Sequence, residues 1–477
     1  MHTADANTEN NNDNNNDNNN ASQSASAQAS THKADNGAEN QLDNELVAKL
    51  SRKVDLARLA QAAEELDTAE FEALVRQAIR RSRPHQPPPI NGDYYDVTAD
   101  LTPQEAAYQK QIRHFLEQEA RPIINDYWER GEFPKELIRP IGQLLCDTLD
   151  ADGYQFPHPS PLMSGVLSLE LGRTEPSVST FIGVHRSLCM GTIFLYGSDE
   201  QKAHWLPAMR RFEKIGSWAL TEPLVGSAAA AGLQTTARRD GAEWVLNGEK
   251  KWSGNATFAD VNVIWARNEE SGQVNGFLVE RPTPGYHVEK LKGKIAKRAV
   301  ENVLIRLDNC RIPLDNRLPG VNSFRDVGKQ LAVGRAGVAW EATGIAMGAY
   351  ERSLAYCNQR AQFGRPITSF QLVQAKLVQM LGNVTAMLSM MRQLTRLQER
   401  DGFVSHERAS LAKAFCSEKM RETVALARGV MGGNGILLEY DVARLFADAE
   451  AVYSYEGTYE MNTLIVGRAI TGISAFV

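Results

Sequence analysis

Apolar residues recur at helical spacing in three stretches ahead of residue 215. Thr102-Pro103-Gln104-Glu105 supplies an N-cap hydroxyl, a first-turn proline and a Glu at the capping-box position, and Tyr108, Ile112, Phe115 and Leu116 follow on one face. The same spacing continues through Leu162–Arg173 and Gln201–Arg211. The pattern predicts a helical domain over residues 91–215.

The pattern then changes to short β-rich runs. Asn247-Gly248 stands between Trp244-Val245-Leu246 and a run that ends at Trp252, which predicts a hairpin because both turn positions need positive φ. Val261, Val263 and Trp265 alternate with polar residues, as in a strand. Further strand-like runs are Gly276–Val279, Tyr286–Val288 and Val303–Leu307. Residues 216–325 are therefore predicted to form a β domain.

Residues 326–477 return to the helical pattern. A stripe with alternating spacings of four and three consists of Leu377, Leu381, Val384, Leu388 and Met391. A turn at Gly364-Arg365-Pro366 separates two such helices, which predicts a four-helix bundle whose remaining faces bury a second subunit. The predicted fold class is α+β, in the order helical domain, β domain, helical bundle.

The residues ahead of the first domain have a different composition. Residues 1–45 are rich in Asn and nearly free of large apolar side chains, which predicts a disordered tail. Residues 46–90 combine helical spacing with the Pro-rich stretch Pro84 to Pro89, which predicts an appended helical segment and a linker.

Charge and cysteine content exclude several classes of protein. The 477 residues carry a formal net charge of -6, without the basic surface that binds phosphate backbones, so no nucleic-acid partner is expected. The five cysteines are dispersed and suit reduced thiols better than disulfides or a metal site. No uncharged apolar run reaches the length of a membrane span and the start lacks a signal pattern, so we expect a cytoplasmic protein.

Two candidate segments lie in the first part of the predicted β domain. The first, Trp218 to Pro223 followed by Gly226-Ser227, offers backbone groups and hydroxyls suited to a flavin or a phosphate, although a domain linker has the same composition. The second is Lys251-Trp252-Ser253-Gly254-Asn255, whose indole could lie against a planar ring or simply fill a core.

Two further segments lie in the predicted bundle. Arg360 to Ile367, followed by Phe370-Gln371, places a guanidinium beside a turn, where it could hold a pyrophosphate or form a surface ion pair. Gly432-Gly433-Asn434-Gly435 precedes Tyr453 to Thr458, in which Glu456 comes before Gly-Thr at a helix start. A helix C-terminal turn and a charge at a helix dipole are the alternatives.

In this order and spacing, the four segments resemble the acyl-CoA dehydrogenase family over roughly residues 100 to 477. The resemblance is closest to the glutaryl-CoA dehydrogenase and plant short-chain acyl-CoA oxidase branch, through Leu318-Pro319-Gly320, the Arg360 segment and Ile470 to Ile473. It implies an oxidoreductase of fatty acid metabolism that binds FAD, usually as a homotetramer.

The resemblance also assigns roles to residues. Glu456 matches the catalytic base, and Ser227, Arg335 and Gly457 match positions that touch the acyl-CoA substrate. The positions that match contacts of FAD are Trp218, Leu220, Thr221, Ser227, Trp252, Ser253, Gly254, Arg360, Gln371, Gly429, Gly432, Gly433, Thr458 and Phe476. The implied reaction is α,β-dehydrogenation to a trans-2-enoyl-CoA, with electrons passed to an electron-transfer flavoprotein.

Three positions depart from the family pattern. Ser179 stands where glutaryl-CoA enzymes have an arginine for the distal carboxylate, which argues against a glutaryl substrate. Ala228 to Ala231 replace an acidic turn, and Arg186 stands where a small polar residue is usual, either to bind a substrate or in an ion pair.

Two other functions remain open. An acyl-CoA oxidase would pass electrons to oxygen, and Gly254 resembles the plant oxidase branch at a position where many dehydrogenases have Thr. A DNA-associated or non-catalytic flavoprotein of the same fold is less compatible with the acidic charge and with Glu456.

Overall fold

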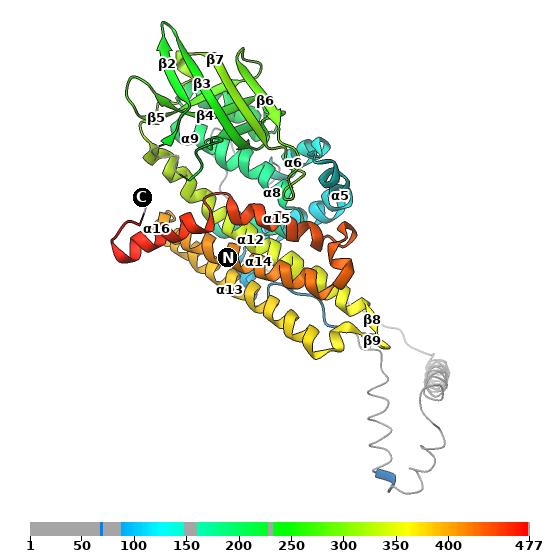
Figure 1. The fold of residues 1–477 in the computed structure, drawn as a ribbon. Coiled ribbons are helices and arrows are strands. Elements are labelled where there is room, and N and C mark those ends of the chain that lie inside the picture. Colours follow the sequence, from blue (N-terminus) through cyan, green and yellow to red (C-terminus); the bar gives the residue numbers. More distant parts are fainter. Residues whose placement is uncertain (1–66, 70–86, 147–159, 228–231, 476–477) are drawn as a thin grey trace, which may run out of the picture. The chain divides into compact units, whose positions relative to one another are not determined.

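A computed structural model describes residues 67–69, 87–146, 160–227 and 232–475 (Figure 1). The chain divides into Met1–Pro88 and a larger unit, Pro89–Val477, and the helices and strands labelled in Figure 1 belong to the larger unit. The predicted tail 1–45 lies outside the described residues, as does almost all of the predicted segment 46–90.

Helices form the first part of this unit. Thr102 caps α4 through the predicted capping box, because its hydroxyl accepts from the Glu105 amide while the Glu105 carboxylate accepts from the Thr102 amide. The elements are η1 (Val97–Asp100), α4 (Pro103–Phe115), η2 (Leu116–Ala120), α5 (Arg121–Arg130), η3 (Lys135–Leu137), α6 (Ile138–Cys146), α7 (Pro161–Thr174), α8 (Pro176–Ile182), η4 (Gly183–Met190), α9 (Gly191–Tyr196) and α10 (Asp199–Arg210).

A seven-stranded sheet follows, with the strand order β1-β4-β2-β3-β7-β6 and with β5 paired to β4. Its strands are β1 (Gly216–Ala219), β2 (Thr236–Asp240), β3 (Glu243–Ser253), β4 (Val261–Asn268), β5 (Val274–Glu280), β6 (Tyr286–Lys290) and β7 (Val303–Pro313). β4 runs parallel to β1 and β2, and the other pairs are antiparallel. Since β4 is buried over almost its whole length, its polar Asn262 lies inside as well.

The predicted Asn247-Gly248 hairpin is wrong. β3 continues through both residues, and the β2–β3 hairpin turns instead at Gly241, whose φ is 63°. The Asn-Gly pair lies at an irregularity in the pairing with β7, where a Cβ on Gly248 would come within 2.7 Å of the Thr235 Cα. Pairing with β7 on both sides of this point outweighs the local turn preference.

The last part is helical again and confirms the predicted order of helices, sheet and helices. Its elements are η5 (Leu314–Asn316), α12 (Phe324–Gln359), β8 (Ala361–Gln362), β9 (Arg365–Pro366), η6 (Ile367–Ser369), α13 (Gln371–Asp401), α14 (His406–Val430), η7 (Gly432–Ile436), η8 (Leu438–Tyr440), α15 (Val442–Ser454) and α16 (Tyr459–Thr471). The predicted stripe on α13 is buried, except that Leu381 is only partly so.

Small residues let α12 approach α7 closely. A Cβ on Gly344 would lie 2.0 Å from the Leu169 carbonyl oxygen, and one on Gly172 would lie 2.3 Å from the Glu341 carbonyl oxygen. Glycine is therefore required at both positions for this packing. The contact brings α12 of the C-terminal helices against the N-terminal helices, and one apolar core spans both.

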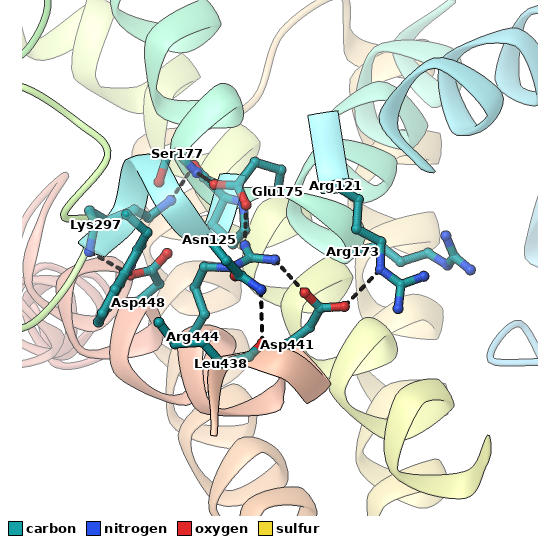
Figure 2. Close-up of polar contacts among 12 residues, drawn as sticks. Arg121, Asn125, Arg173, Glu175, Ser177, Lys297, Leu438, Asp441, Arg444 and Asp448 are labelled. Atoms are coloured by element: carbon teal, nitrogen blue, oxygen red, sulfur yellow. Dashed lines mark hydrogen bonds and ion pairs between the residues drawn. The ribbon is translucent and has the colours of Figure 1, made fainter. Parts of the chain in front are cut away.

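Buried polar groups join the same two sets of helices (Figure 2). Arg444 on α15 is fully buried and donates to Glu175, the N-cap of α8, and to Asp441 at 3.0 Å. Asp441 also accepts from Arg121 on α5 at 2.7 Å. Breaking one partner of such a network would leave a buried charge uncompensated.

One continuous helical stretch, Pro176–Tyr196, is the one candidate for a membrane span among the described residues, by length and composition only. Half of its apolar window is buried within the fold. Cys189, Cys310, Cys357 and Cys416 are free and buried.

Candidate functional site

A cavity of about 2090 Å³ opens where the sheet meets the two sets of helices. α7, α8 and η4 line one part, β1, the end of β3 and residues 293–302 line a second, and α12 and the segment after α15 line a third. The volume is large enough for two organic ligands side by side.

The turn between α15 and α16 presents Glu456 to this cavity. Glu456 has φ 55° and Gly457 has φ 82°, so two successive residues are left-handed, which costs energy at the non-glycine position. Thr458 then caps α16, since its hydroxyl accepts from the Met461 amide at 3.3 Å. Two helix ends thus confine Glu456 to one short turn.

Two buried cations hold the backbone of this turn. The Lys413 ammonium on α14 donates to the carbonyl oxygens of Tyr453 and Gly457, both at 2.8 Å. Arg335 on α12 donates to the Glu456 carbonyl oxygen at 3.3 Å. The turn is therefore fixed on both sides of Glu456.

The Glu456 carboxyl group itself is nearly unpartnered. Its Oε2 is buried and has no hydrogen-bond partner among the described residues. Burial raises the pKa of Glu456 to about 7, against the opposing charges of Arg335 and Lys413. Burial likewise lowers the pKa of Lys413 to about 8, which Glu456 opposes. A carboxyl group with a pKa near neutrality is suited to accept a proton.

His406, the first residue of α14, contacts Arg335. Both of its ring nitrogens lie 3.0 Å from Arg335 Nη1. Burial and the charge of Arg335 lower the pKa of His406, so the ring is held neutral and can accept from the guanidinium. This contact orients Arg335 toward the Glu456 turn.

The sheet side of the cavity carries a planar surface. Trp252, at the end of β3, is 52% exposed and has φ 75°, which turns its indole out of the strand. The neighbouring Ser253 hydroxyl is buried without a partner among the described residues, and Trp218 also lines the cavity. A Cβ on Gly254 would come within 3.3 Å of Val184, so the space beside Gly254 is narrow.

A buried ion pair lies beside this surface. Lys250 on β3 is fully buried and donates to Glu222 at 2.8 Å and to the Leu220 carbonyl oxygen at 3.1 Å. Glu222 also accepts from the amides of Gln234 and Thr235. The Leu220–Glu222 segment is therefore held at the edge of the cavity.

Most of the sequence-predicted site residues meet at this cavity. Those that line it are Trp218, Leu220, Thr221, Ser227, Trp252, Ser253, Gly254, Arg335, Glu456, Gly457 and Thr458. Ser179 and Arg186, which depart from the family pattern, line the cavity too. Phe476 and the Ala228–Ala231 turn lie outside the described residues.

Five predicted residues do not line the cavity. They are exposed and lie in or beside the C-terminal elements α12, α13, α14 and η7: Arg360, Gln371, Gly429, Gly432 and Gly433. Tyr356, at the end of α12, accepts from Asn434 of η7 at 2.9 Å, which links the Arg360 turn to the glycine segment.

Sequence reasoning missed Lys413, His406 and the Lys250–Glu222 pair. Lys413 carried a usable signal, because it stands on the apolar face of α14 with Ala409, Ala412 and Cys416, all of which are buried. A lysine at such a position needs buried acceptors. The sequence did not reveal which carbonyl groups these would be.

Comparison with known proteins identifies the fold and the chemistry. Three family models match in succession: the N-terminal domain of acyl-CoA dehydrogenase over residues 102–213, the middle domain over 217–310 and the C-terminal domain over 324–471. The chain belongs to the acyl-CoA dehydrogenase family. It is an oxidoreductase of the FAD-dependent kind found in that family.

Individual relatives agree with this assignment. An acyl-CoA dehydrogenase of Bacillus subtilis is 31% identical over 377 residues, which are 78% of this chain and 99% of the relative. The crystal structure of glutaryl-CoA dehydrogenase from Mycobacterium smegmatis is 36% identical, with a TM-score of 0.77, over 82% of this chain and all of that one. A second structure of a glutaryl-CoA dehydrogenase from this organism, in complex with FADH2, is 33% identical, with a TM-score of 0.77, over 80% of this chain and 98% of that one.

The pH dependence of stability should report the burial of Glu456. Between pH 4.5 and about 7 the folded acyl-CoA dehydrogenase keeps a proton that the unfolded chain releases, so the contribution of Glu456 to stability is lost as the pH rises. The effect of Glu456→Gln is the free energy of unfolding of the variant minus that of wild type. We expect this effect to be more stabilising at pH 8 than at pH 5, by up to about 2 kcal/mol. Denaturant unfolding at the two pH values measures this, and an equal effect at both would contradict it.

Gly334 on α12 leaves room for the carboxyl group. A Cβ there would lie 2.7 Å from Glu456 Oε2, whereas one on Gly328 of the same helix would meet no atom within 4 Å. We expect Gly334→Ala to slow flavin reduction by acyl-CoA at least about tenfold, because it displaces the carboxyl group. Alanine favours a helix at both positions, so Gly328→Ala controls for backbone stiffening. Equal rates in the two variants would exclude this role of Gly334.

Proposed function

We propose that this acyl-CoA dehydrogenase desaturates an acyl-CoA thioester, with Glu456 removing the α-proton. The observation that carries the proposal is the Glu456 carboxyl group, which faces the cavity with Oε2 buried and without a partner among the described residues, and whose pKa burial raises to about 7. An α-hydrogen of a thioester is a weak acid, so the base must be desolvated and must have a pKa near neutrality. Such a group deprotonates a substrate and then retains the proton.

The thioester oxygen needs a donor as negative charge develops on it. We assign the Glu456 amide to this role, because left-handed Gly457 has no side chain to keep a thioester from the backbone. Arg335 and Lys413 add positive charge near the same turn, which favours the anionic form of Glu456 and of the substrate.

The sheet side of the cavity fits a flavin. We assign Trp252, Trp218 and the Leu220–Thr221 segment to the flavin ring, because the Trp252 indole is exposed and the Ser253 hydroxyl has no partner in the part of the chain that the structure describes. FAD supplies the acceptor for the β-hydride. The residues of this chain hold the thioester against that acceptor, exclude water and move the α-proton.

Arg360, Gln371, Gly429, Gly432 and Gly433 require a second copy of the chain in this proposal. They are exposed and do not line the cavity, and the exposed apolar side chains Leu372 and Val378 of α13 lie near them in sequence. We therefore assign this surface to the FAD of a neighbouring subunit in a homotetramer. An electron-transfer flavoprotein is the proposed electron acceptor and the cytoplasm the proposed compartment.

The first test removes the base. Glu456→Gln keeps the volume of the side chain but cannot take the proton, so we expect FAD to be retained and flavin reduction by acyl-CoA to fall by several decades. Anaerobic bleaching of the flavin, followed in a stopped-flow spectrometer over a series of acyl chain lengths, measures the rate. Substantial reduction in the variant would place the base elsewhere.

The second test concerns the end of the acyl chain. Ser179 supplies no positive charge, and the nearby Lys297 ammonium already donates to Pro176, Thr180 and Glu341. An unpaired carboxylate would cost several kcal/mol to bury, so we expect kcat/KM for butyryl-CoA or hexanoyl-CoA to exceed that for glutaryl-CoA at least tenfold. If glutaryl-CoA gave the highest value, Arg186 would be the next candidate for the counter-charge.

A further inference from the structure

Lys297 connects several elements behind the Glu456 turn. It belongs to the segment between β6 and β7 and has φ 47°, a left-handed conformation that is unfavourable for lysine. Its amide donates to Asp448 Oδ1 of α15 at 2.5 Å (Figure 2). The Trp128 indole donates to the same oxygen at 2.9 Å. These contacts hold the strained backbone in place.

The Lys297 side chain reaches back into the wall of the cavity. Its ammonium donates to the Pro176 carbonyl oxygen, to the Thr180 hydroxyl at 3.1 Å and to Glu341 Oε1 at 2.8 Å. All three hydrogens are therefore used. The side chains of Lys297 and Glu341 are each 5% exposed, so this is a buried ion pair with a full set of partners on the cation.

Glu341 also contacts the residue that precedes Glu456. Its second oxygen, Oε2, accepts a hydrogen bond from the Tyr455 hydroxyl, and Tyr455 directly precedes Glu456. The Lys297 ammonium also lies 5.9 Å from the centre of the Tyr455 ring. A continuous polar chain thus runs from α8 through Lys297 and Glu341 on α12 to Tyr455.

We propose that Lys297, Glu341 and Tyr455 are positioning residues that fix the direction of the Glu456 carboxyl group. Glu456 Oε2 makes no hydrogen bond of its own among the described residues, so backbone and neighbouring side chains determine where it points. Lys413 and Arg335 hold the carbonyl groups of the turn, and Tyr455 fixes the residue before Glu456. The proposal rests on the proposed role of Glu456.

A purely structural ion pair is the competing explanation. Replacing both members of a buried pair together often changes stability little, so stability alone does not separate the two explanations. The position of the Glu456 carboxyl group separates the two explanations, because a displaced carboxyl group would reach solvent and lose its elevated pKa. Charged and titratable groups on the elements around Glu456 include Lys297, Arg335, Glu341, His406, Glu407, Lys413, Glu450, Tyr453, Tyr455, Glu460 and Arg468.

The test uses Tyr455→Phe, which removes only the hydroxyl, in the full-length FAD-loaded enzyme. The first measurement is the change in Tm that Glu456→Gln causes, taken at pH 8 and at pH 5. The value at pH 5 is subtracted from the value at pH 8. This difference is measured once in the otherwise wild-type chain and once in the chain that carries Tyr455→Phe. We expect this difference to fall to less than half in the variant. It requires no catalysis, so it remains informative if the proposed reaction is wrong.

The second measurement is flavin reduction by acyl-CoA. We expect Tyr455→Phe to lower the limiting rate constant at least tenfold and to change the Kd for acyl-CoA less than threefold. Tyr459→Phe is the matched control, because it removes a hydroxyl from the same segment and Tyr459 stacks on Tyr453 instead of bonding to Glu341. It should react within twofold of wild type.

An unchanged Tm difference in Tyr455→Phe would overturn the positioning role, whatever the rates. A reduced difference in an enzyme that no acyl-CoA bleaches would support the positioning role and reject the proposed reaction. If Tyr455→Phe does not fold, the double variant Lys297→Met/Glu341→Gln replaces it with the same two measurements. Because the double variant removes both charges, it avoids leaving an unpaired one.

Discussion

The constraint on which this site depends is a carboxyl group, that of Glu456, whose Oε2 is buried and makes no hydrogen bond within the described part of the chain. Such a group cannot be fixed through its own oxygens, so the protein fixes the backbone on either side of it. Lys413 and Arg335 bind the carbonyl groups of the turn, which lies between the end of α15 and the start of α16. The strain at Glu456, with φ 55°, persists because these contacts over-determine the turn.

The cations that hold the turn also influence its chemistry. Burial raises the pKa of Glu456, and the charges of Arg335 and Lys413 oppose that change. The resulting pKa of the carboxyl group is near neutrality. Each cation is in turn buried and needs acceptors, which the turn supplies as carbonyl oxygens. Position and acidity therefore come from the same contacts, and a change in one cation would alter both.

Local sequence signals predicted most elements of the fold, and they failed where distant contacts decided. The Thr102 capping box and the stripe on α13 were read correctly because their partners lie within one or two helical turns. Asn247-Gly248 was misread because pairing with β7, which is distant in the sequence, keeps β3 extended. Lys413, His406 and Lys297 were missed because their hydrogen-bond partners lie on other elements.

By itself, the sequence determined the order of helices, sheet and helices and the four segments that carry the family resemblance, since both depend on spacing along the chain. Only the tertiary structure decided that Glu456 lies beside Arg335, 121 positions away, and that Glu341 joins Lys297 to Tyr455. It also separated Arg360 and the glycine segment from the cavity. The physical reason is that burial and charge pairing act between elements that are distant in sequence, and no local pattern encodes which carbonyl group a buried cation will meet.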